Sequence, residues 1–284
     1  MRLRSLLLPI VFTAVLAAAQ DTAKPGTTVP QGSSIPGLSG VPGAEGGGYI
    51  EFGGGRSDLT KPLPSWTDFY ARGMFIPNAS NGVDGEIDRE SRYGDQGWYY
   101  GLGLTHTFGD NFYADVHAGT SKGGFFLPKY RADGSVNFKL LAQKRLVFGA
   151  GAGYDKSKTI NTALRTQATW TYYFDWPFVV QGGVVLTRAN PGGIMAPSGY
   201  AAVTQGREKD HFITFRMETG REAYELLADA KHNRFSAFDF PIHNYAITWR
   251  QWVGNNWGLN LNLQRDVNPY FNRNGATLGL FLDF

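Results

Sequence analysis

The residues best placed to do chemistry are four carboxylates spaced two apart along one short segment, namely Asp84, Glu86, Asp88 and Glu90. Alternate side chains of an extended strand point to the same face, so this spacing predicts a row of acids. Such a row is repulsive unless cations or arginines offset it. It indicates a surface that selects small charged solutes, a salt-bridge network or, if the segment is a loop, a site for divalent cations.

Further polar side chains alternate with apolar ones in later segments. Asp115 and His117 share one face, where we expect a hydrogen-bonded network rather than a catalytic pair. The remaining charges expected on the same polar surface are Lys139, Arg165, Arg216, Glu218, Arg250 and Asp266. The basic members of this set, together with Arg72, are the partners that we expect to offset the acidic row.

Signals for catalysis are weak. Ser121 lies between Gly119 and Gly123, which is the spacing of a nucleophile elbow, but the strand-to-helix turn that the motif needs is not expected. His232 and Ser236 in a long loop leave a lipid-modifying enzyme as an alternative. The chain has no cysteine, which excludes a cysteine nucleophile and a thiolate zinc site. We therefore expect no enzyme, no cofactor and no metal.

The first residues differ from the rest of the chain. Two arginines precede an apolar stretch that ends in Ala17-Ala18-Ala19, which is typical of a cleaved secretory signal peptide over residues 1–19. Residues 20–48 are rich in Gly and Pro and predict a disordered periplasmic tether. Nearly balanced charge without a basic run argues against nucleic-acid binding. Residues 49–284 remain as one domain.

That domain alternates apolar and polar residues throughout, with a period of two that is typical of half-buried strands. The last segment shows it most clearly, with leucines at 278, 280 and 282 on one face. We predict 14 strands, with 12 as the alternative. The expected starts are near Tyr49, Trp66, Val83, Gly97, Phe112, Ser135, Leu146, Ile160, Phe178, Ser198, His211, Asp239, Trp257 and Gly275.

Three features favour an all-β, antiparallel transmembrane β-barrel over a soluble one. The chain carries an export signal, and full charges such as Arg165 occur in mid-strand, where a lumen tolerates them and a dry core does not. Aromatic residues gather near expected strand ends, around residues 66–70, 108–113, 172–178 and 249–257, as in interfacial girdles. Short connections such as 175–177 alternate with long ones such as 222–238, which predicts both termini in the periplasm.

Residues 50–284 also resemble the YaiO family of outer-membrane β-barrel proteins. The resemblance lies in IEFGG at 50–54, WTDFYARG at 66–73, RESRYGD at 89–95 and WYYG at 98–101. It continues in WGLNL at 257–261, NPY at 268–270, RNG at 273–275 and LGL at 278–280. The terminal Phe284, after Leu278, Leu280 and Leu282, resembles the signal read by the barrel assembly machinery. The resemblance implies an outer-membrane barrel but no activity.

These observations predict a protein of the Gram-negative outer membrane. We expect a non-enzymatic conduit for small polar solutes or saccharides, or a structural barrel. The alternatives are the lipid-modifying enzyme at the rim and an accessory to envelope assembly or polysaccharide export. The expected partners are outer-membrane lipid and the assembly machinery during insertion, with a small polar solute as a possible ligand.

Overall fold

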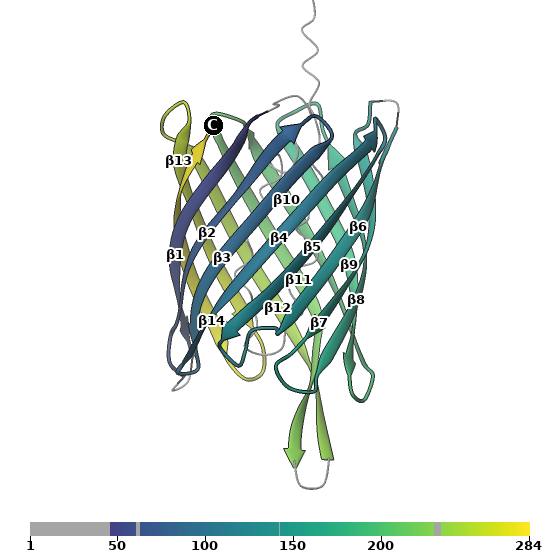
Figure 1. The fold of residues 1–284 in the computed structure, drawn as a ribbon, viewed down its shortest axis with the longest axis vertical. Coiled ribbons are helices and arrows are strands. Elements are labelled where there is room, and N and C mark those ends of the chain that lie inside the picture. Colours follow the sequence, from purple (N-terminus) through teal and green to yellow (C-terminus); the bar gives the residue numbers. More distant parts are fainter. Residues whose placement is uncertain (1–45, 61–62, 142, 230–233) are drawn as a thin grey trace, which may run out of the picture.

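The computed structural model describes residues 46–60, 63–141, 143–229 and 234–284, with the backbone alone over 223–229 and 234–239. The described chain forms 14 antiparallel strands that close into one barrel (Figure 1). The strands are β1 (Gly48–Leu59), β2 (Trp66–Asn78), β3 (Asn81–Arg92), β4 (Asp95–Gly109), β5 (Phe112–Gly123), β6 (Tyr130–Leu140), β7 (Leu146–Lys156), β8 (Thr162–Tyr173), β9 (Phe178–Asn190), β10 (Ile194–Arg207), β11 (His211–Asp229), β12 (Arg234–Trp252), β13 (Trp257–Val267) and β14 (Asn272–Asp283).

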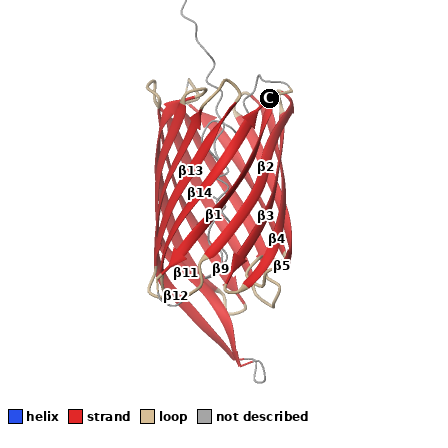
Figure 2. Cartoon of the chain, turned by 90° about the vertical axis from the view of Figure 1, so that its left-hand side faces the viewer, coloured by secondary structure: helices blue, strands red, loops and turns tan. Residues whose placement is uncertain are grey.

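Each strand pairs with its neighbours in the chain, and β1 pairs with β14 to close the barrel, from Tyr49 opposite Asp283 to Leu59 opposite Arg273. The end that carries the start of β1 and the end of β14 is called the near rim, and the opposite end the far rim. The β11–β12 hairpin projects beyond the far rim (Figure 2). Closure leaves no unpaired strand edge, as a sheet in lipid requires.

Alternate residues of each strand point to opposite faces of the sheet, so the barrel has an outer and an inner surface. Apolar side chains such as Leu102, Val184 and Leu278 point outward and are exposed, whereas Glu51, Asp88 and Arg250 point inward and are buried. This apolar-out, polar-in arrangement is that of a transmembrane barrel. In the described part of the chain, no helix is long and apolar enough to cross a membrane.

The predicted number of strands is confirmed, but several strands are longer than expected at the far rim. The four largest differences are β6, β10, β12 and β14, which begin at Tyr130, Ile194, Arg234 and Asn272 rather than near Ser135, Ser198, Asp239 and Gly275. Beyond the apolar band these segments lose their alternation while the backbone pairing continues. Most of the long loop expected at 222–238 is therefore paired strand.

The expected aromatic girdles are only half correct. Phe69, Phe108 and Trp176 are exposed on the outside, as girdle residues are. Several of their sequence neighbours instead face the lumen and are buried, namely Trp66, Tyr70, Tyr113, Tyr173 and Trp252. Clustering in the sequence does not separate these two groups, because adjacent residues of a strand point to opposite faces.

Residues 1–45, which include the predicted signal peptide and nearly all of the predicted tether, lie outside the described residues. The barrel itself runs from Gly48 to Asp283. Phe284 follows β14 at the near rim, where its backbone N–H donates to Gly48 O at 3.0 Å and its carbonyl accepts from Gly48 N–H at 2.9 Å. Leu278, Leu280 and Leu282 lie on the outer face of β14.

Candidate functional site in the barrel lumen

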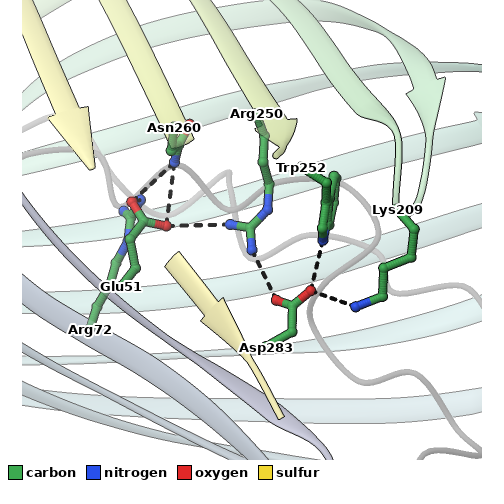
Figure 3. Close-up of polar contacts among 7 residues, drawn as sticks. All are labelled: Glu51, Arg72, Lys209, Arg250, Trp252, Asn260 and Asp283. Carbon is green, nitrogen blue, oxygen red and sulfur yellow. Dashed lines mark hydrogen bonds and ion pairs between the residues drawn. The ribbon is translucent and has the colours of Figure 1, made fainter. Parts of the chain in front are cut away.

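A polar cluster lies inside the barrel near the near rim, centred on the buried carboxylate of Glu51 on β1 (Figure 3). Oε1 of Glu51 accepts hydrogen bonds from Tyr70 Oη at 2.7 Å, Arg72 Nη2 at 2.6 Å and Asn260 Nδ2 at 3.1 Å. Its Oε2 lies 3.4 Å from Arg250 Nη1. One carboxylate thus joins side chains from β1, β2, β12 and β13.

Asp283 extends this cluster toward the rim. Its Oδ2 accepts from Trp252 Nε1 and Lys209 Nζ, each at 2.8 Å, and its Oδ1 lies 3.4 Å from Arg250 Nη2. The Arg250 guanidinium carbon also lies 3.4 Å from the centre of the Phe281 ring. Arg250 is therefore held by two carboxylates and an aromatic face, and it links β12 to both strands of the closing β1–β14 pair.

The four carboxylates of the acidic row lie on the lumen face of β3. The alternative prediction, that they lie in a loop and bind divalent cations there, is therefore wrong. Arg92, on the same strand, pairs with Glu90 at 2.6 Å between Nη2 and Oε2. Nδ1 of His117 on β5 lies 3.4 Å from Oδ2 of Asp84. Among the described residues, no group of three or more His, Asp and Glu side chains is placed to hold a metal ion.

The arginines expected to offset the acidic row pair elsewhere. Arg165 on β8 lies 2.9 Å from Asp155 and 3.7 Å from Asp133. Arg216 pairs with its strand neighbour Glu218 at 2.9 Å. Neighbours on the same or the adjacent strand thus satisfy these charges, because side chains on opposite walls are separated by the lumen, whereas neighbours on one wall are within reach.

The other predicted lumen residues also find local partners. Asp115 accepts hydrogen bonds from Ser135 Oγ at 2.6 Å and Asn137 Nδ2 at 3.1 Å. The ammonium of Lys139 lies 5.5 Å from the centre of the Tyr113 ring. Asp266 accepts from Arg273, Asn244 and Gln264.

Glycines on the lumen face let large side chains lie flat against the wall. A Cβ at Gly103 on β4 would lie 2.2 Å from the His117 ring and 2.4 Å from Asp84 Oδ1, and one at Gly101 would lie 2.9 Å from Glu86. On β7, the glycines of the 149–153 run similarly lie beneath Asn137, Gln167 and Arg165. Small residues in these strands therefore accommodate neighbouring side chains.

One cavity lies on the lumen face of five neighbouring strands, β3, β2, β1, β14 and β13, with about 770 Å³ of empty space that includes open solvent. Asp68, Glu86 and Asp88 line its acidic wall. Asn262 and Gln264 contribute amides from β13.

The β5–β6 connection narrows the far end of the lumen. Phe126 and Leu127 are buried and pack with Tyr99 on the lumen face of β4. Lys158, in the β7–β8 loop, donates hydrogen bonds to the carbonyls of Gly123 and Gly124 and so fastens this connection. Burial lowers the pKa of the Lys158 ammonium.

The expected catalytic candidates are not assembled in the described part of the chain. Ser121 lies at the far end of β5, where its hydroxyl donates to the Pro128 carbonyl at 2.5 Å. The cross-strand partner of Ser121 is Tyr99. His232 lies outside the described residues, and only the backbone of Ser236 is described, in β12.

Sequence reasoning missed several charges that organise the lumen, namely Glu51, Arg131, Asp133, Asp155, Arg273 and Asp283. Each lies on the inward face of its strand, which the alternation of its neighbours could have shown. Glu51 was hidden because the residues that follow it on the inward face are Gly53 and Gly55. Its importance comes from partners on three other strands, which no local pattern contains.

A closed barrel with an apolar outer face and a charged lumen defines the chain as a transmembrane β-barrel protein. The chain matches the YaiO membrane β-barrel domain over residues 48–225, and it belongs to this family of outer-membrane barrels. No curated protein matches the chain.

The chain is also similar to solved structures of membrane barrels. The CymD monoaromatic hydrocarbon channel is 5% identical, with a TM-score of 0.55 over 84% of this chain and 88% of its own. An anion-selective porin from Comamonas acidovorans is 8% identical, with a TM-score of 0.47 over 84% of this chain and 98% of its own. OmpT of Vibrio cholerae, an outer membrane protein, is 10% identical, with a TM-score of 0.48 over 85% of this chain and 99% of its own. At such identities, the likeness concerns the fold alone.

Proposed function

We propose that this protein is a non-enzymatic conduit for small polar solutes across the outer membrane. The observation that carries the proposal is the charged lumen, in which a cavity lies beside carboxylates of the acidic row. Charges of both signs along a pore orient and select small charged solutes. A barrel built only for support has no need of an acidic wall facing such a cavity.

The orientation and assembly of the barrel belong to the same proposal. The long β11–β12 hairpin projects from the far rim, and outer-membrane barrels carry their longer loops outside the cell, so the near rim faces the periplasm and both termini lie there. Leu278, Leu280, Leu282 and Phe284 form the signal that the barrel assembly machinery reads at this rim. Outer-membrane lipid covers the apolar face.

Conductance of the refolded barrel in a planar bilayer tests the proposal. We expect stable single-channel steps, and we expect Glu86→Gln with Asp88→Asn to shift the ion selectivity away from cations, because two lumen carboxylates are removed. Asp110→Asn, at an exposed turn of the near rim, serves as the control and leaves the selectivity unchanged. A barrel that shows heat-dependent gel mobility yet remains silent contradicts the conduit.

A second measurement concerns the constriction at the far end. Replacing Phe126 and Leu127 by serine removes the apolar surface that packs against Tyr99 and is expected to raise the conductance, because apolar constrictions obstruct water and ions by dewetting. Phe125→Ser, at an exposed side chain of the same loop, is the matched control. Equal conductance for wild type and the double variant would show that the constriction lies elsewhere.

A further inference from the structure

The cavity between β2, β3, β13 and β14 has an excess of unpaired acid. Within the described part of the chain, Asp68, Glu86 and Asp88 make no ion pair, although all three line the cavity. Carboxylates facing one cavity repel one another and attract a cation into it.

The arginines that line the same cavity already have partners. Arg72 lies 2.6 Å from Glu51, and Arg92 lies 2.6 Å from Glu90. The third, Arg273, pairs with Asp266. None of these three acceptors lines the cavity. Each of these arginines is thus paired with a carboxylate outside the lining, whereas Asp68, Glu86 and Asp88 make no ion pair with a described residue.

Buried polar atoms independently point to a missing hydrogen-bond partner. Trp66 and Asp88 line the cavity and are only 4% and 3% exposed. Nε1 of Trp66 and Oδ2 of Asp88, together with Oδ2 of Asp68, are buried and make no hydrogen bond with any described residue. Buried polar atoms in proteins nearly always have a partner, so these atoms fit a ligand or ordered water.

Strand β13 supplies hydrogen-bond acceptors to the cavity. Asn262 donates through Nδ2 to Thr248 at 2.9 Å, and Gln264 donates through Nε2 to Asp266 at 3.1 Å. The amide oxygens of both residues accept no hydrogen bond from the described residues. A ligand in the cavity therefore meets carboxylates of β2 and β3 at one end and amide carbonyls of β13 at the other, a combination that favours a donor-rich molecule.

We propose that this cavity binds a small organic cation that carries hydroxyl groups. Its ammonium group lies against Asp88 and its acidic neighbours, and its hydroxyls donate to Asn262 and Gln264. Charge-assisted hydrogen bonds to carboxylates are about twice as strong as neutral ones, so the ammonium dominates the affinity. This inference deepens and rests on the conduit proposal, since it names the class of solute that the lumen selects.

Calorimetric titration of the folded barrel in detergent tests the inference with two probes of nearly equal size. Serinol is glycerol with its central hydroxyl replaced by an ammonium group. We expect saturable binding of serinol and about tenfold weaker binding of glycerol. Asp88→Asn is expected to weaken serinol binding about tenfold and to leave glycerol unchanged.

Asp115→Asn is the matched control, because Asp115 is an equally buried lumen carboxylate that does not line the cavity. Equal loss of serinol binding in both variants would contradict a local site, because it would show that the negative potential of the whole lumen attracts the cation. Equal binding of both probes, or displacement of serinol by Mg²⁺ at the same concentration, would overturn an organic-cation site. Binding is measured without conduction, so a silent barrel that binds serinol contradicts only the conduit, and a conducting barrel that does not bind it contradicts only this site.

Discussion

Replacing Arg250 by leucine is expected to lower the free energy of unfolding by about 3–5 kcal/mol, the usual cost of removing one partner from a buried ion pair. Arg250 is 0% exposed and lies between the carboxylates of Glu51 and Asp283. Without it, Asp283 retains Trp252 and Lys209, while Glu51 retains Arg72, Asn260 and Tyr70. Two carboxylates then share less positive charge at the strand pair that closes the barrel. Urea titration in lipid vesicles, followed by heat-dependent gel mobility, measures the loss.

Arg56→Leu provides the control for the same chemical change. Arg56 also pairs with a carboxylate, that of Asp58 at 3.0 Å, but its side chain is 67% exposed. Exposed pairs contribute below about 1 kcal/mol, so this variant should unfold nearly as the wild type does. Equal losses for both arginine variants would mean that water reaches the Glu51 cluster freely and that it does not brace the closing strands.

A double-mutant cycle separates the ion pair from the general effect of losing a large side chain. Glu51→Gln keeps the size of the side chain and removes its charge. If Arg250 and Glu51 interact directly, the double variant loses less stability than the sum of the two single variants. Strict additivity would contradict the direct interaction across β1 and β12, although Arg250 could still act through Phe281.

The fold could be predicted almost entirely from the sequence, because the constraint on a membrane barrel is repeated in every strand. Each residue of the lipid face must be apolar, while the lumen face admits charge, so even weak alternation is informative when summed over 14 strands. Errors gathered at the far rim, where β12 begins at Arg234 rather than near Asp239. There the lipid constraint ends and only backbone pairing continues.

The sequence predicts which residues face the lumen, but it does not predict which of them form ion pairs with one another. Period-two spacing places Asp84, Glu86, Asp88 and Glu90 on one face, and this is where they lie. This spacing does not determine the register between neighbouring strands, and the register decides which lumen residues lie at the same level of the barrel. Arg165 therefore meets Asp155 on the adjacent β7 rather than the acidic row, and Glu51 meets Arg250, which is 199 residues away in sequence.

A charge on the lipid-facing surface of the barrel should cost more stability than the same charge on the lumen face. Replacing Val184 by arginine is expected to lower the free energy of unfolding in lipid by about 2–4 kcal/mol, the cost of a cationic side chain at the bilayer midplane of a barrel. Val184 lies at the middle of β9 and is 63% exposed on the outer face. The arginine would have to reach the interface along an apolar surface that includes Leu186. Urea titration in vesicles measures the difference from wild type.

Gln167→Arg places the same charge at the same height on the other surface. Gln167 on β8 is paired in register with Val185, next to Val184, and its side chain lies on the lumen face. A water-accessible lumen tolerates the added charge, so the expected change is within about 0.5–1 kcal/mol. If the lumen variant loses as much stability as the lipid-face variant, the lumen is drier than a conduit needs. If neither variant loses stability, the outer face at Val184 is not covered by hydrocarbon. If only the Val184 variant loses a large part of its free energy of unfolding, the outer face of this wall contacts lipid and its lumen face is accessible to water.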